Sequence, residues 1–169
     1  SDTHGVGTLD AIIFRYAEVL LIRAEAGAEL GKDPELDLTV NALRKRVGFN
    51  VKLTSSPATD PKLVAKHPII KGTNADLIRE IRRERRVELF GEGLRYADLM
   101  RWGCGERLVA PKAGMMLYTD VYTPEEIAVL KTEVGTYADG SLDVYGKRVT
   151  TPAIFESPKH YLFSLPLNE

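Results

Sequence analysis

The sequence predicts a mainly α-helical protein of antiparallel helix pairs, with an irregular loop and hairpin region in its last third. Three observations predict this class. Apolar residues recur at helical spacing between residues 10 and 105. Glycines and prolines stand where those helices should end. After Gly105 the helical spacing gives way to turn signals and strand-forming residues.

The first predicted pair is a helical hairpin. Its first helix covers about residues 12–30, and Gly31 is suited to end it because glycine readily adopts a left-handed conformation. The opposite face of this helix, including Glu25 and Glu29, is expected to be solvated. A second helix is expected at about residues 38–47, before Gly48. The side chains expected on the buried face of the first helix are Ile13, Ala17, Leu20, Leu21, Ala24 and Ala28.

A long irregular segment should separate this pair from the next. Residues 49–71 contain three prolines among serines, threonines and lysines, which favours a loop. A third helix is predicted at about residues 74–90. Thr73 and Asp76 before it have the spacing of a capping box, although Glu or Gln is usual at the second position. Glycines then interrupt the pattern, and a fourth helix is expected at about residues 94–102.

The last third carries shorter signals. Thr123 and Glu126 flank a proline in the order of a cap and its reciprocal carboxylate, which predicts a helix over residues 124–133. Asp139 and Gly140 separate two groups of strand formers, residues 134–138 and 142–145, as in a hairpin. Residues 161–167 should be extended and half-buried.

The third helix places charges where core residues belong. On a helical wheel, Glu84, Arg85 and Glu88 fall on the same arc as the apolar residues that begin the helix. One interpretation is a partly buried ion-pair network that also draws in Arg95 and Arg101, with Arg15 or Arg44 as further partners, because an unpaired charge there would be costly. Such a network would fix helix packing and perform no chemistry. The alternative is a solvated helix end.

Composition and motif spacing argue against several function classes. With 23 Lys and Arg against 24 Asp and Glu, the chain has no overall attraction for nucleic acid, and Glu80 and Glu84 interrupt the five arginines of residues 79–86. A single cysteine excludes an intrachain disulfide and a thiolate cluster. No run approaches the roughly 20 apolar residues of a membrane span. Without a Glu-x-x-His motif or a catalytic triad, we expect no metal, cofactor or enzymatic activity.

Four segments carry a family resemblance. They are FRYAEVLLIRAEA (14–26), NALRKRVG (41–48), ERRVELFGEGLRYADLMRW (84–102) and YLFSLPLNE (161–169). In this order they resemble the C-terminal portion of the SusD/RagB family, outer-membrane nutrient-binding lipoproteins. Leu94 stands where the family often has His, and Ser164 where it usually has Pro, so local hydrogen bonding and chain direction there could differ.

The resemblance implies tetratricopeptide-like helix pairs and a single domain over residues 1–169, with a helical part at 10–105 and an irregular part at 106–169. We expect the chain to be a fragment of a longer protein. The implied function is non-catalytic binding of a glycan or other nutrient at the cell surface. The implied partner is a TonB-dependent, SusC-like transporter, and the implied membrane attachment is a lipid anchor outside this chain. The alternative is a free-standing tetratricopeptide-type scaffold that binds peptides.

Aromatic side chains outside the predicted helices are the candidate ligand contacts, because flat rings pack against the apolar faces of sugars. Trp102 belongs to the most specific matched segment, where its expected role is architectural, and we expect it to be buried. For each tyrosine, packing within the core or hairpin is the alternative interpretation. The predicted ligand-binding residues are Tyr118, Tyr122, Tyr137 and Tyr145.

Overall fold

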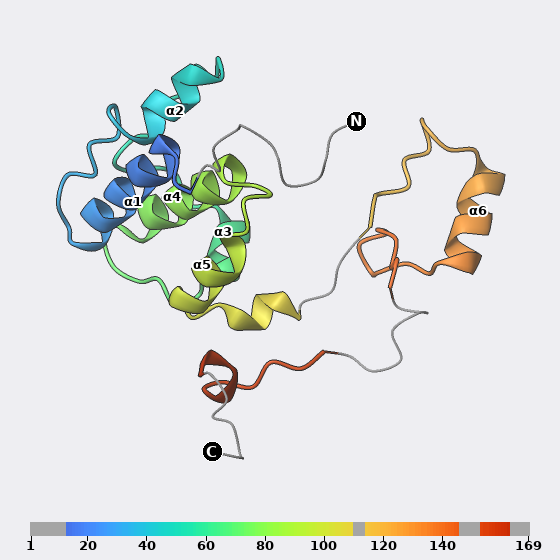
Figure 1. Ribbon diagram of the computed structural model, residues 1–169. Coiled ribbons are helices and arrows are strands. Elements are labelled where there is room, and N and C mark those ends of the chain that lie inside the picture. The colour runs from blue at the N-terminus through green and yellow to red at the C-terminus, as the bar shows by residue number, and fades with distance from the viewer. Residues whose placement is uncertain (1–12, 110–113, 146–152, 163–169) are drawn as a thin grey trace, which may run out of the picture. The chain divides into compact units, whose positions relative to one another are not determined.

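The computed structural model describes residues 13–109, 114–145 and 153–162 (Figure 1). This part of the chain is mainly helical and contains only isolated β-bridges, which confirms the predicted class. The chain divides into two compact units, residues 1–97 and 98–169. The single-domain organisation stays a prediction. The helices are α1 (Tyr16–Glu29), α2 (Val40–Arg46), α3 (Pro61–Lys66), α4 (Ala75–Glu88), α5 (Arg95–Arg101) and α6 (Pro124–Glu133), with 3-10 turns η1 (Gly105–Leu108) and η2 (Lys159–Tyr161).

The core of the first unit lies where α1 packs against α4 and α2. Leu21 of α1 and Ile81 of α4 are fully buried, and each such side chain contributes about 1.5–3 kcal/mol through removal from water. α3 packs separately against α4. The buried cluster is Ala17, Leu20, Leu21, Ala24, Ala28, Val40, Leu43, Leu53, Leu77, Ile78, Ile81 and Leu89.

Two predictions for the first helix are wrong. Arg15 has an extended backbone and caps α1, so the helix begins at Tyr16 and Ile13 precedes it, 81% exposed. The Arg15 side chain binds Glu92, far along the sequence. Glu25 is buried rather than solvated, because an arginine of α4 compensates its charge there.

The start of α4 also differs from the prediction. Its N-cap is Asn74, which makes no capping bond through its side chain. The Asn74 amide donates to the carbonyl of Ala28 at 3.0 Å, and Asp76 accepts from the Thr59 hydroxyl at 2.5 Å. The predicted capping box of Thr73 and Asp76 is wrong, because the N-cap is Asn74 and the Asp76 carboxylate bonds Thr59 instead.

The predicted loop over residues 49–71 contains one helix, α3. Asp60 caps it by accepting from the backbone N–H of Lys62 at 2.8 Å, and Pro61 occupies the first helical position. Proline favours that position because its missing N–H has no helical partner there. Helix α3 was not predicted, because Pro61 was counted among the residues that favour a loop.

The second unit confirms the predicted helix over residues 124–133. α6 has the expected capping box, in which Thr123 and Glu126 bond reciprocally. In place of the predicted hairpin, the structure has a turn with isolated bridges. Thr136 pairs with Leu142, and the backbone N–H of Tyr137 donates to the Ser141 carbonyl at 2.8 Å. The Asp139 side chain holds the turn by accepting from Ser141.

The predicted extended segment at residues 161–167 is wrong at its first residue. Tyr161 ends the 3-10 turn η2, and its hydroxyl accepts from the backbone N–H of Gly105 at 2.8 Å. Of the two described residues of this segment, Leu162 has extended backbone, and its side chain is exposed rather than half-buried. Residues 163–167 lie outside the described part of the chain.

Candidate functional site

The charged face of α4 is densely paired with α1 and α2. The Glu88 carboxylate binds Arg15 at 2.6 Å and Arg46 at 2.7 Å. Glu84 pairs with Arg44, whose side chain is only 8% exposed. These contacts place two of the predicted network residues, Glu84 and Glu88, between helices.

The remaining predicted network residues lie in different settings. Arg85 is buried on α4 and faces Glu18 of α1 at 3.7 Å. Arg95 is the first residue of α5. Arg101 ends α5, where its Nε lies 3.1 Å from a carboxylate oxygen of Asp98 one turn earlier. The architectural role of this set stays a prediction.

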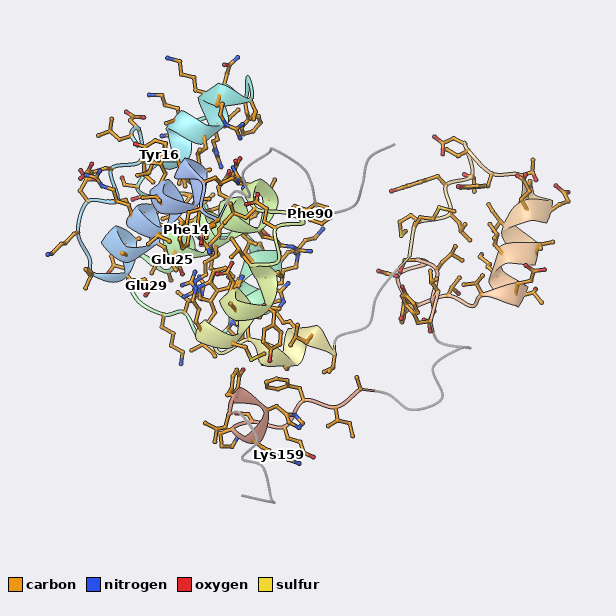
Figure 2. All side chains as sticks on the ribbon, in the orientation of Figure 1. Phe14, Tyr16, Glu25, Glu29, Phe90 and Lys159 are labelled. Atoms are coloured by element: carbon orange, nitrogen blue, oxygen red, sulfur yellow. The ribbon has the colours of Figure 1, made fainter. Side chains whose placement is uncertain are left out.

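The most buried ion pair in this group was not among the predicted residues. Arg82 of α4 lies 3.1 Å from Glu25 and 2.9 Å from Glu29. Both glutamates are on α1 and are labelled in Figure 2. The side chains of Arg82 and Glu25 are 9% and 6% exposed. A signal was present, because Glu25 follows the buried Leu21 by four residues and therefore shares its face.

The pKa values of this region follow the same contacts. Hydrogen bonds to Glu92 and Glu88 raise the pKa of Arg15, and the Arg15 bond lowers the pKa of the Glu92 carboxyl. Burial raises the pKa of Glu80, an effect that the neighbouring Arg83 partly opposes. Each of these shifts therefore follows from an ion pair or from burial.

The second unit holds the four predicted ligand-binding tyrosines. Tyr118 and Tyr145 are exposed, whereas Tyr122 and Tyr137 are half-buried. The Tyr137 hydroxyl donates to Asp143 at 2.8 Å, and this bond raises the pKa of Tyr137. The Tyr122 hydroxyl lies 3.4 Å from the sulfur of Met115.

A hollow of about 350 Å³ lies beside Tyr122. Tyr122 is the one predicted tyrosine among its lining residues; the other three contribute nothing to this lining in the described part of the chain. The α6 residues that line this hollow were not predicted, although Ile127 and Lys131 are four residues apart and so share a helix face. The lining residues are Thr119, Tyr122, Pro124, Ile127, Ala128 and Lys131.

A second hollow, of about 500 Å³, lies in the first unit beside the connection between α1 and α2. Its charged lining is already paired, since Lys52 binds Asp37 at 2.9 Å. Asn41, also in the lining, bonds both the N–H and the carbonyl of Leu53. These bonds give the polar groups of this hollow a structural role.

The described residues contain neither a cluster suited to a metal ion nor a helix suited to crossing a membrane. Within residues 13–109, 114–145 and 153–162, no group of three His, Cys, Asp or Glu side chains could hold a metal ion. In the same residues no helix has the length and apolarity needed to cross a bilayer.

Trp102 is buried as predicted, and the guanidinium of Arg101 lies 4.8 Å from its ring centre.

The comparisons with known proteins agree with the motifs. The model of the SusD family matches residues 1–166. The chain belongs to the SusD family. A SusD-like protein, P38 of Formosa agariphila, is 36% identical over 104 residues, which are 62% of this chain and 19% of the relative. This SusD-family chain therefore spans about a fifth of the length of that relative. No solved structure matches it significantly.

Proposed function

We propose that this chain is part of a surface protein that binds a glycan or other nutrient without chemically changing it. The match of the SusD family over residues 1–166 carries the proposal. The paired charges of α4 support it, because they are committed to joining helices. The hollow beside Tyr122 supports it as well, since an aromatic ring beside apolar side chains suits the face of a sugar.

The same proposal covers location and partner. The longer protein sits on the outer membrane through a lipid anchor, and it delivers its ligand to a TonB-dependent transporter. The exposed side of α1 supports a place within a longer helical array. Tyr16, Val19 and Ile22 are at least half exposed there, and helix pairs of the tetratricopeptide type bury such faces against neighbouring pairs.

Affinity electrophoresis of the full-length protein tests the binding function. Gels containing single polysaccharides should retard the protein in at least one case, and isothermal titration with the matching oligosaccharide should give a saturable isotherm. Tyr122→Ala should weaken that binding about tenfold or more, since a stacked aromatic ring contributes most through its buried area. Absence of retardation across neutral and acidic polysaccharides would contradict a glycan as the ligand.

A further inference from the structure

The hollow beside Tyr122 is built by one continuous piece of chain, residues 119–131. The Tyr118 carbonyl accepts from the backbone N–H of both Val121 and Tyr122, at 3.1 and 3.0 Å, and so closes a turn. The capping box of Thr123 and Glu126 then fixes where α6 starts. Hydrogen bonds within this segment therefore fix both the turn that carries Tyr122 and the start of α6.

The floor is one face of α6. Pro124, Ile127, Ala128 and Lys131 follow one another at spacings of three, one and three residues, so their side chains lie along the same side of the helix. Tyr122 adds an aromatic ring to the lining. Apolar groups make up most of this lining, which suits the C–H face of a pyranose ring.

Lys131 is the one charged residue in this lining. Its ammonium group has no ion pair or side-chain hydrogen bond within the described residues, whereas Lys52 and Lys159 are both paired with carboxylates. An ammonium group at the end of an apolar stem can reach an anion while its methylenes stay against the floor. The Thr119 hydroxyl adds one further hydrogen-bonding group.

We propose that this hollow binds a uronic acid residue of an acidic oligosaccharide, an inference that rests on the proposed glycan-binding function. The apolar ring face packs on Tyr122 and Ile127, and the sugar carboxylate pairs with Lys131. Because Lys131 is the one charged residue of the lining, the hollow suits one uronic acid residue, which carries a single carboxylate.

Isothermal titration of the full chain with tetragalacturonate and with its methyl ester tests the charge requirement. At each of its four residues, the acid differs from the ester only in the carboxylate charge and in one methyl group. At low salt the acid should bind about tenfold more tightly than the ester, because hydrogen bonds between two charged groups are the stronger kind. This advantage should shrink at about 0.5 M salt as charges are screened. Tetramers of β-1,4-glucuronate and mannuronate extend the panel to other linkages.

Two matched variants test whether the preference for the acid over the ester arises at the hollow. Lys131→Met keeps an apolar stem and removes the charge, so the acid and the ester should bind with nearly equal affinity. Lys62→Met removes the same charge from an exposed position on α3 and should leave the preference for the acid unchanged. A Lys131→Met protein that retains the full preference would overturn the inference.

The outcomes separate this inference from the function on which it rests. If acid and ester bind equally and Tyr122→Ala abolishes binding of both, the uronic acid assignment is wrong and the binding function stands. A sulfated oligosaccharide that binds more tightly than every uronate would likewise overturn the carboxylate assignment. If no saccharide of either kind binds, both proposals fail.

Discussion

The helices α4 and α6 are stabilised in different ways. α4 buries eight of its 14 residues, and these include Arg82, which pairs with Glu25 of α1. Its partly buried Glu84 pairs with Arg44 of α2. α6 buries none of its ten residues, and its start is set by a capping box and a proline. The stability of the first unit therefore depends on contacts between distant segments, whereas that of α6 depends on hydrogen bonds within a few residues. Substitutions in the two helices should therefore differ in size and in how far their effects spread.

The largest effect is expected from Arg82→Ala. This change leaves the Glu25 carboxylate, 6% exposed, without the guanidinium 3.1 Å away. Breaking a buried pair from one side costs about 3–5 kcal/mol. Urea denaturation of the full chain should show this loss, and Arg46→Ala, at a side chain that is 58% exposed, should cost under about 1 kcal/mol. Similar losses for the two variants would remove the distinction between buried and surface pairs.

Glu88→Ala should have an intermediate effect and tests the predicted ion-pair network. Glu88 binds both Arg15 and Arg46, and its side chain is 15% exposed. We expect a loss of about 1–3 kcal/mol, which lowers the melting temperature by several degrees and leaves ligand affinity unchanged. Glu92→Ala is the control, because Glu92 also binds Arg15 but is 34% exposed. An unchanged melting temperature in Glu88→Ala would contradict the network.

The same comparison explains what could be predicted from the sequence. The bounds of α6 were predicted correctly because Thr123, Pro124 and Glu126 act on adjacent backbone. The start of α1 was not, because the Arg15 side chain binds residues of α4 and the loop after it, which a local pattern cannot reveal. Glu25 was assigned to the solvated face although it follows Leu21 by four residues, because the arginine that compensates its charge is 57 residues away.

The residues of the candidate site also differ in whether the sequence alone could predict them. Tyr122 could be proposed from residue type alone, since an aromatic outside a helix is a common ligand contact. Lys131 could not, because its relevance depends on the turn that places Tyr122 over the same face of α6. Tyr137 shows the reverse case: its residue type is suitable, but its hydroxyl is bonded to Asp143 within the hairpin turn.

Thr123→Ala should have a smaller and local effect. The substitution removes the Thr123 hydroxyl, which accepts from the N–H of Glu126 at 3.3 Å, and should cost about 1 kcal/mol. Amide hydrogen exchange should speed up about fivefold in α6 while α4 stays protected. Thr132→Ala is the control, since a hydroxyl bonded back to the carbonyl four residues earlier adds little to helix stability. Equal acceleration in α4 would mean that the two regions are coupled.

The smallest effect should come from Glu80→Gln, and it should depend on pH. Burial raises the pKa of Glu80, so the folded protein holds this proton more tightly than the unfolded chain does. The stability that results is complete below the unfolded pKa of about 4.3 and is lost as pH rises through the higher folded pKa. The uncharged glutamine avoids that loss, so the stability of the variant relative to wild type should rise from about pH 4 upward.

Asp37→Asn should show the opposite trend and serves as the matched control. The hydrogen bond from Lys52 lowers the pKa of Asp37, so wild type gains stability as pH rises through the folded and then the unfolded pKa. The asparagine variant lacks this gain and should become less stable relative to wild type up to about pH 5. Thermal melts between about pH 3 and 8 measure both slopes. Slopes of the same sign would mean that burial does not decide the protonation of Glu80.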